Sequence, residues 1–95
     1  MVHFEVDSTR TYRKKLGHSQ KSAAYFMGWK KTNNLSRYEH GVKLPGLINA
    51  LKLEIVYRTP VAFLFRELYG QLKREIRMRE ESLKTKNGHE GKIRA

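Results

Sequence analysis

Cysteine is absent from this 95-residue chain, which excludes disulfide bonds, thiolate metal sites and thiol catalysis. No apolar run approaches the roughly 18 residues of a membrane span, and the first residues lack the basic-then-apolar order of a signal peptide. A chain of this length fits one domain, whose core leaves little room for an internal active site. These absences favour a cytoplasmic binding protein without cofactor or metal, and they argue against an enzyme or a membrane protein.

Acidic residues are few, with 9 Asp and Glu against 20 Lys and Arg, and the formal net charge is +11. None lies between Asp7 and Glu39, a stretch that holds 8 Lys and Arg. Apolar side chains, among them Phe26 and Trp29, are interleaved with these charges, so we expect the stretch to fold and not to form a disordered tail. A folded surface of one sign suggests a polyanionic partner.

Apolar residues at helical spacing, together with capping residues, predict three helices in the first half of the chain. They cover residues 9–16, 20–27 and 33–39. Their expected caps are Asp7 or Ser8, then Ser19, then Thr32 or a neighbour. Gly17 and Gly28 follow the first two helices, and Gly28 is expected in the left-handed conformation that a tight turn requires.

Two further helices are predicted in the second half. Apolar residues nearly encircle the fourth, residues 47–57, so we expect it to be central. The fifth begins at Thr59-Pro60 and continues as a charged extension. Its apolar stripe consists of Val61, Leu64, Phe65, Leu68, Leu72 and Ile76.

The predicted class is all-α, with no internal repeat. We divide the chain into an arm (1–7), a helical domain (8–66), a helical extension (67–84) and a flexible basic tail (85–95). Apolar residues alternate within the arm as in a strand, but three such positions are too few to predict one.

The most specific pattern in the chain consists of Ser19-Gln20, Ala24, Gly28, Leu35-Ser36-Arg37-Tyr38-Glu39-His40-Gly41 and Pro45. This spacing resembles the Cro and lambda-repressor-like (XRE-type) helix-turn-helix family over about residues 9–65. The resemblance implies a five-helix lambda-repressor-like DNA-binding domain with an extended C-terminal helix, in which the second and third helices dock in the major groove. The chain departs from the family pattern by one extra residue between Gly28 and Leu35, and by Ala23 in place of leucine.

The resemblance implies DNA contacts at the start of the second helix and around the start of the third. The expected DNA-binding residues are Gln20, Lys21, Lys30, Lys31, Thr32, Asn33, Asn34 and Arg37. Lysine suits guanine and phosphate, asparagine suits adenine, and Gln20 can bind phosphate through its amide and free backbone N–H groups. Simpler roles stay open, namely unspecific phosphate attraction for Lys30 and Lys31, a helix cap for Asn33 and plain solvent exposure for Arg37.

Other residues of the pattern have structural roles. The resemblance pairs Glu39 with Arg13, and this pair would tie the first helix to the third. Gly28 is expected to form the tight turn after the second helix. The residues expected in the core are Trp29, Leu35 and Tyr38, because they keep helical spacing in a domain that needs its aromatic side chains inside.

The sequence therefore predicts a transcription regulator of the bacterial or phage cytoplasm, associated with the nucleoid, that represses by occupying double-stranded DNA. A homodimer through residues 61–84 is expected, because one short helix reads few base pairs. The alternative for this stripe is packing inside its own domain. The alternative function is an antitoxin that binds DNA and masks a toxin with its C-terminal helix. An RNA-binding module is a weaker alternative.

Overall fold

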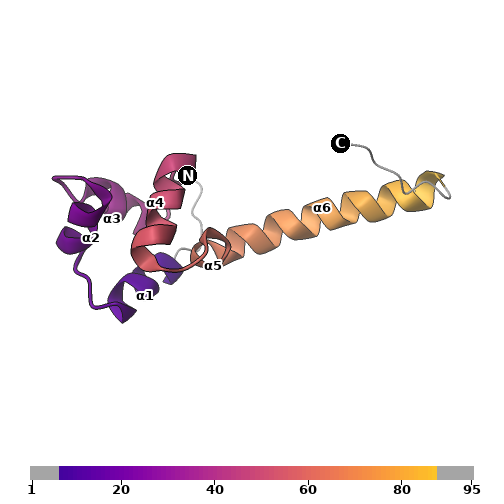
Figure 1. Ribbon diagram of the computed structural model, residues 1–95. Coiled ribbons are helices and arrows are strands. Elements are labelled where there is room, and N and C mark those ends of the chain that lie inside the picture. The colour runs from indigo at the N-terminus through magenta and orange to yellow at the C-terminus, as the bar shows by residue number, and fades with distance from the viewer. Residues whose placement is uncertain (1–6, 88–95) are drawn as a thin grey trace.

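The computed structural model describes residues 7–87, and this part of the chain is helical without any strand. Its helices are α1 (Asp7–Lys15), α2 (Gln20–Met27), α3 (Asn33–Glu39), α4 (Leu47–Tyr57), α5 (Val61–Leu64) and α6 (Arg66–Asn87). The first five form a small domain, from which α6 projects as one long helix (Figure 1). The predicted all-α class is confirmed. The predictions for residues 1–6 and 88–95 lie outside the described residues.

The limits of α2 and α3 match the prediction, and local chemistry explains those of α2. The Ser19 hydroxyl accepts a hydrogen bond from the backbone N–H of Ser22 at 3.0 Å, which caps α2. Gly28 ends it with φ at 87°, in the left-handed region that glycine adopts without strain. Thr32 is the N-cap residue of α3, as expected, but its side chain makes no capping hydrogen bond.

The first helix differs from the prediction at both ends. It begins at Asp7, so both residues expected as its cap lie inside its first turn. It ends at Lys15, and Leu16, which was expected on the apolar face, is exposed beyond the last turn. Of the two residues expected on the apolar face, only Tyr12 packs against the core.

The core lies where α2, α3, α4 and α5 meet. Its buried members are Ala23, Ala24, Met27, Leu35, Tyr38, Leu53, Tyr57, Leu64 and Phe65. Ala23 and Ala24 are small, so α4 can approach α2 closely, and the Asn49 side chain donates to the Tyr38 hydroxyl at 3.2 Å. Trp29 packs against this cluster and is partly buried, so the expected core positions of Trp29, Leu35 and Tyr38 are confirmed.

The fourth helix is not central, contrary to the prediction. It buries one side only, through Ala50, Leu53 and Tyr57. The residues of its other side, Leu47, Ile48, Leu51 and Ile55, are 48–75% exposed. Apolar residues on all sides of a helix normally indicate burial on every side, and residues 7–87 do not provide that burial.

The predicted fifth helix is two helices, so the domain and its extension contain six and not five. Phe65 leaves the helical conformation with φ −123° and ψ 48°, and it is buried. The break lets Leu64 and Phe65 both enter the core, and α6 then leads away from the domain, so that the molecule measures 54 × 27 × 21 Å. Helix α6 also includes residues 85–87, which were expected in the flexible tail.

Candidate nucleic-acid interface

The turn between α2 and α3 is held by backbone hydrogen bonds. The N–H of Gly28 donates to the Tyr25 carbonyl at 3.0 Å, and the N–H of Trp29 donates to the Ala24 carbonyl at 2.8 Å. Leu35 and Tyr38 are buried on the inner side of α3. The outer side of α3 and the turn before it therefore face solvent in a fixed orientation.

The structure exposes five of the eight predicted DNA-binding residues, four of them in this turn and on α3 and one on α2. The exposed ones are Lys21, Lys30, Lys31, Asn33 and Arg37, whereas Gln20, Thr32 and Asn34 are half-buried. Within residues 7–87, no hydrogen bond or ion pair occupies the side chains of Lys30, Lys31 or Arg37. These cations are thus available to an external anion.

Lys43, in the loop after α3, joins this surface although the sequence did not single it out. Its ammonium group donates to Oδ1 of Asn34 at 3.4 Å. The bond orients the Asn34 amide and places one more positive charge next to the start of α3. Only the fold brings these two residues together, since no local motif relates positions 34 and 43.

A buried ion pair connects α1 to α3. Nε of Arg13 lies 2.5 Å from Oε2 of Glu39, and Nη2 donates to Oε1 at 3.0 Å. The two side chains are 8% and 4% exposed. Nη1 of Arg13 also donates to the His18 carbonyl in the turn before α2 at 3.0 Å. The pair implied by the resemblance is therefore present as a bidentate, buried contact that joins three segments.

Gln20 belongs to the same network, which the sequence did not predict. Its amide nitrogen donates to Oε1 of Glu39 at 3.0 Å. The first residue of α2 is thereby locked against the end of α3. One of the two N–H groups of the side-chain amide expected to bind phosphate is engaged inside the protein, so a phosphate contact at this position would use the other one or the free backbone N–H groups of the first turn of α2.

The network perturbs the titration of two groups. The hydrogen bond that Arg13 donates to Glu39 raises the pKa of Arg13 above its ordinary value, against the opposing effect of burial, so the guanidinium stays charged. Burial raises the pKa of Tyr57 to about 12, with a further increase from the Glu39 charge and a decrease from Arg13. The Tyr57 hydroxyl is buried without a hydrogen-bond partner in the described part of the chain.

Replacing Tyr57 by phenylalanine should raise the free energy of unfolding by about 1 kcal/mol, because it removes a buried polar group that makes no hydrogen bond. Urea unfolding at neutral pH measures this change. Tyr38→Phe is the matched control, since Tyr38 is equally buried but its hydroxyl accepts from Asn49, and its loss should destabilise by about 1 kcal/mol. Equal destabilisation by both variants would contradict the prediction.

The same variant should alter the behaviour in alkali. The pKa of Tyr57 in the folded protein, about 12, lies above the ordinary value of 10.0. Ionisation of this hydroxyl therefore leaves the free energy of unfolding unchanged below about pH 10 and lowers it as the pH rises toward about 12. Tyr57→Phe should lose less stability than the natural chain over that interval.

Comparison with known proteins agrees with the geometry. A family model described as helix-turn-helix matches residues 10–64, which is more than half of the chain. The match runs from within α1 to the end of α5 and stops before α6. No curated protein matches the chain. No helix among residues 7–87 is long and apolar enough to cross a membrane.

Proposed function

This chain belongs to the Cro and lambda-repressor-like helix-turn-helix family of DNA-binding regulators, and we propose that it represses transcription by occupying a specific double-stranded operator. The observation that carries the proposal is the exposed surface formed by the turn before α3, with Lys30 and Lys31, and by the outer side of α3, with Arg37; these three side chains lack partners within residues 7–87. A recognition helix presents its N-terminal part to base edges in the major groove.

The residue types on this surface suit both kinds of DNA contact. Asn34, near the start of α3, can pair with adenine, and Arg37, one turn later, can pair with guanine. The other expected residues, Gln20, Lys21, Lys30, Lys31, Thr32 and Asn33, lie around the start of α2 and in the turn, where phosphate contacts position a protein on the duplex. The Arg13 and Glu39 pair and Gly28 have structural roles, because they hold these elements in place.

We further propose a non-enzymatic protein of the bacterial or phage cytoplasm, associated with the nucleoid, that acts without a cofactor. It pairs as a homodimer through residues 61–84, since Leu72 and Ile76 of α6 are half-exposed and one short recognition helix reads few base pairs. The operator should then be palindromic, with half-sites roughly 34–36 Å apart, one turn of the duplex.

A second candidate function rests on the same helix. An exposed apolar stripe on α6, with Tyr69, Leu72 and Ile76 about half-exposed, also suits an antitoxin that binds DNA and covers a toxin with this helix. The two functions differ in what binds α6. A chain that represses its own operator with no second protein supports the regulator.

Replacement of Asn34 or Arg37 by alanine should change the preference at one or two base pairs by about 1–3 kcal/mol. Lys14→Ala is the control, because Lys14 is exposed on α1 outside the helix-turn-helix, and its loss should weaken all sequences alike. Selection from random duplex DNA gives the preferred site, and binding to a panel of single-base variants of that site measures the effect. A uniform loss of affinity for all three variants would overturn direct base reading by α3.

A further inference from the structure

The outer face of α4 is an apolar surface that no other helix within residues 7–87 covers. Leu47, Leu51 and Ile55 follow each other at four-residue steps, and Ile48 lies beside them. All four are 48–75% exposed. The outward face of a surface helix is normally polar, and an exposed apolar patch usually marks an interface.

Helix α6 carries an apolar ridge of the same kind. Leu68, Leu72 and Ile76 also follow each other at four-residue steps, and the last two are 46% and 48% exposed. The ridge continues an apolar groove of about 330 Å³ at the corner between α5 and α6. The residues that line this groove are Val61, Ala62, Phe65, Leu68, Tyr69 and Leu72.

The two ridges match in composition and in length. Each reads leucine, leucine, isoleucine, and eight residues of helix at 1.5 Å per residue span about 12 Å. Ridges formed at four-residue steps on two helices interdigitate when the helices cross at roughly −50°, the commonest packing of helices in globular proteins. Within one chain α6 leads away from α4, so its outer part does not cover that helix (Figure 1).

We propose that α6 of one copy lies across the outer face of α4 of a second copy, and that the partner's α6 does the same in return. This inference rests on the homodimer proposed above and specifies what each α6 binds. Reciprocal docking around a two-fold axis covers both apolar ridges of both chains with one interface. Leu51 and Leu72, the middle residues of the two ridges, meet at the crossing point.

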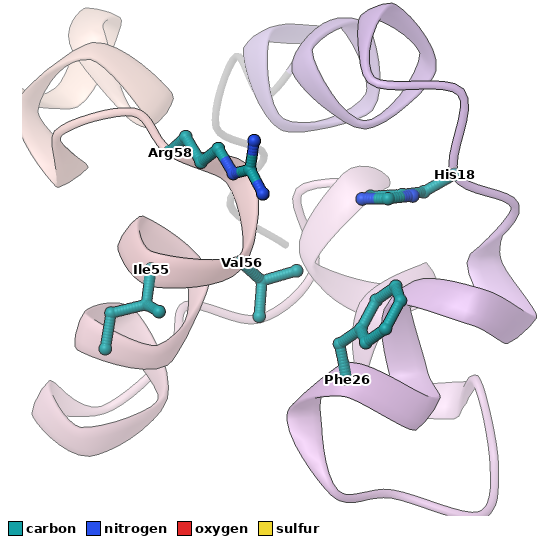
Figure 2. Close-up of a pocket in the computed structure, with 5 residues that line it drawn as sticks. All are labelled: His18, Phe26, Ile55, Val56 and Arg58. Carbon is teal, nitrogen blue, oxygen red and sulfur yellow. The ribbon is translucent and has the colours of Figure 1, made fainter.

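Charge at the ends of the ridges fits this arrangement. A hollow of about 320 Å³ lies at the C-terminal end of the α4 ridge, lined by His18, Phe26, Ile55, Val56 and Arg58 (Figure 2). The Arg58 guanidinium has no side-chain partner in residues 7–87. On α6, Glu67 and Glu75 adjoin the two ends of the ridge, so either direction of crossing brings a carboxylate toward Arg58. Lys73 and Arg74 lie nearby on α6, so we expect this pairing to add little affinity.

Pairing of α6 with α6 of a second copy would cover fewer of the exposed apolar residues. Its seam positions, at alternating steps of three and four, are Tyr69, Leu72, Ile76, Arg79 and Leu83. Arg79 interrupts the apolar seam, which in a coiled coil is filled by apolar side chains. Such a pair would also leave the whole outer face of α4 in water. A second copy docked on α4 removes both difficulties.

Cysteine cross-linking tests the arrangement cleanly, because the chain has no cysteine of its own. Leu51→Cys in one chain and Leu72→Cys in a second, tagged chain are mixed, allowed to exchange subunits and oxidised. The proposal predicts a disulfide between the two different chains as the main product. Met78→Cys in place of Leu72→Cys is the matched control, since Met78 is exposed on a different face of α6 and should give little mixed product.

The outcomes separate this inference from the proposed homodimer. A disulfide only between two Leu72→Cys chains would overturn docking on α4 while leaving a dimer through α6. Neither disulfide, together with a monomer in sedimentation at micromolar concentration, would overturn both. Leu51→Glu provides a second measurement: it should weaken dimerisation at least tenfold while the melting of the monomer is unchanged, because Leu51 is exposed in the single chain. A dimer unaffected by Leu51→Glu would contradict the proposal.

Discussion

Replacement of Glu39 by alanine should lower the free energy of unfolding by about 3–5 kcal/mol, because it leaves the buried Arg13 guanidinium without its counter-charge. Arg13 and Glu39 are 8% and 4% exposed, so water does not replace the lost carboxylate. Of the contacts described for the Arg13 side chain, only the His18 carbonyl would remain. Gln20 would also lose its acceptor, so the start of α2 would no longer be fixed to the end of α3.

Chemical unfolding of the natural chain and the variant measures this loss. The control is Glu80→Ala, because Glu80 forms an ion pair with Arg77 at 3.2 Å on the surface of α6, with side chains 47% and 62% exposed. A pair as exposed as this one contributes only about 0–1 kcal/mol. Similar small losses for Glu39→Ala and Glu80→Ala would show that burial of the Arg13 pair has no energetic consequence, contrary to the prediction.

The limits of α2, α3 and α4 could be predicted from the sequence, and for α2 local chemistry determines them. Ser19 and Gly28 bound α2 by a capping hydroxyl and a left-handed residue, both of which are read from the chain directly. The break at Phe65 could not be predicted in this way. It arises because Phe65 packs into the core formed by distant helices, and the residues around it have no glycine or proline to mark it.

The outer face of α4 shows a different limit of the sequence. An apolar residue indicates that a position is removed from water, but it does not say whether the same chain or another molecule covers it. The helix at residues 47–57 was therefore expected to be central, whereas the fold leaves Leu47, Ile48 and Ile55 on the surface. The same ambiguity applies to Leu72 and Ile76 on α6.

The location of the candidate interface could be predicted from the sequence, but the side-chain hydrogen bonds within it could not. The resemblance placed Lys30, Lys31 and Arg37 at the turn and on α3, where the structure exposes them. The bonds from Gln20 to Glu39 and from Lys43 to Asn34 join residues far apart in sequence, and neither pair follows a helical or turn spacing. Which bases or phosphates these residues contact stays a prediction.

The affinity for duplex DNA should fall about a thousandfold between roughly 50 and 200 mM salt, if about six phosphates are neutralised at the interface. Each neutralised phosphate releases a counterion, which lowers log K by about 0.9 for each unit of log salt concentration. Seven of the eight basic residues between Asp7 and Glu39 are exposed, and Arg13 alone is buried in its ion pair. The exposed cations on this part of the surface are therefore enough to neutralise about six phosphates.

Measuring the affinity for one duplex at several salt concentrations gives the slope of log K against log salt concentration. Single substitutions then show which residues contribute to this slope. Lys31→Ala should reduce the slope by about 1, because Lys31 lies exposed in the turn before α3. Lys84→Ala is the matched control, since Lys84 is an exposed lysine near the far end of α6 and should leave the slope unchanged. A slope near zero for the natural chain would contradict electrostatic binding, and an equal reduction by both variants would place α6 as well as α3 against the DNA backbone.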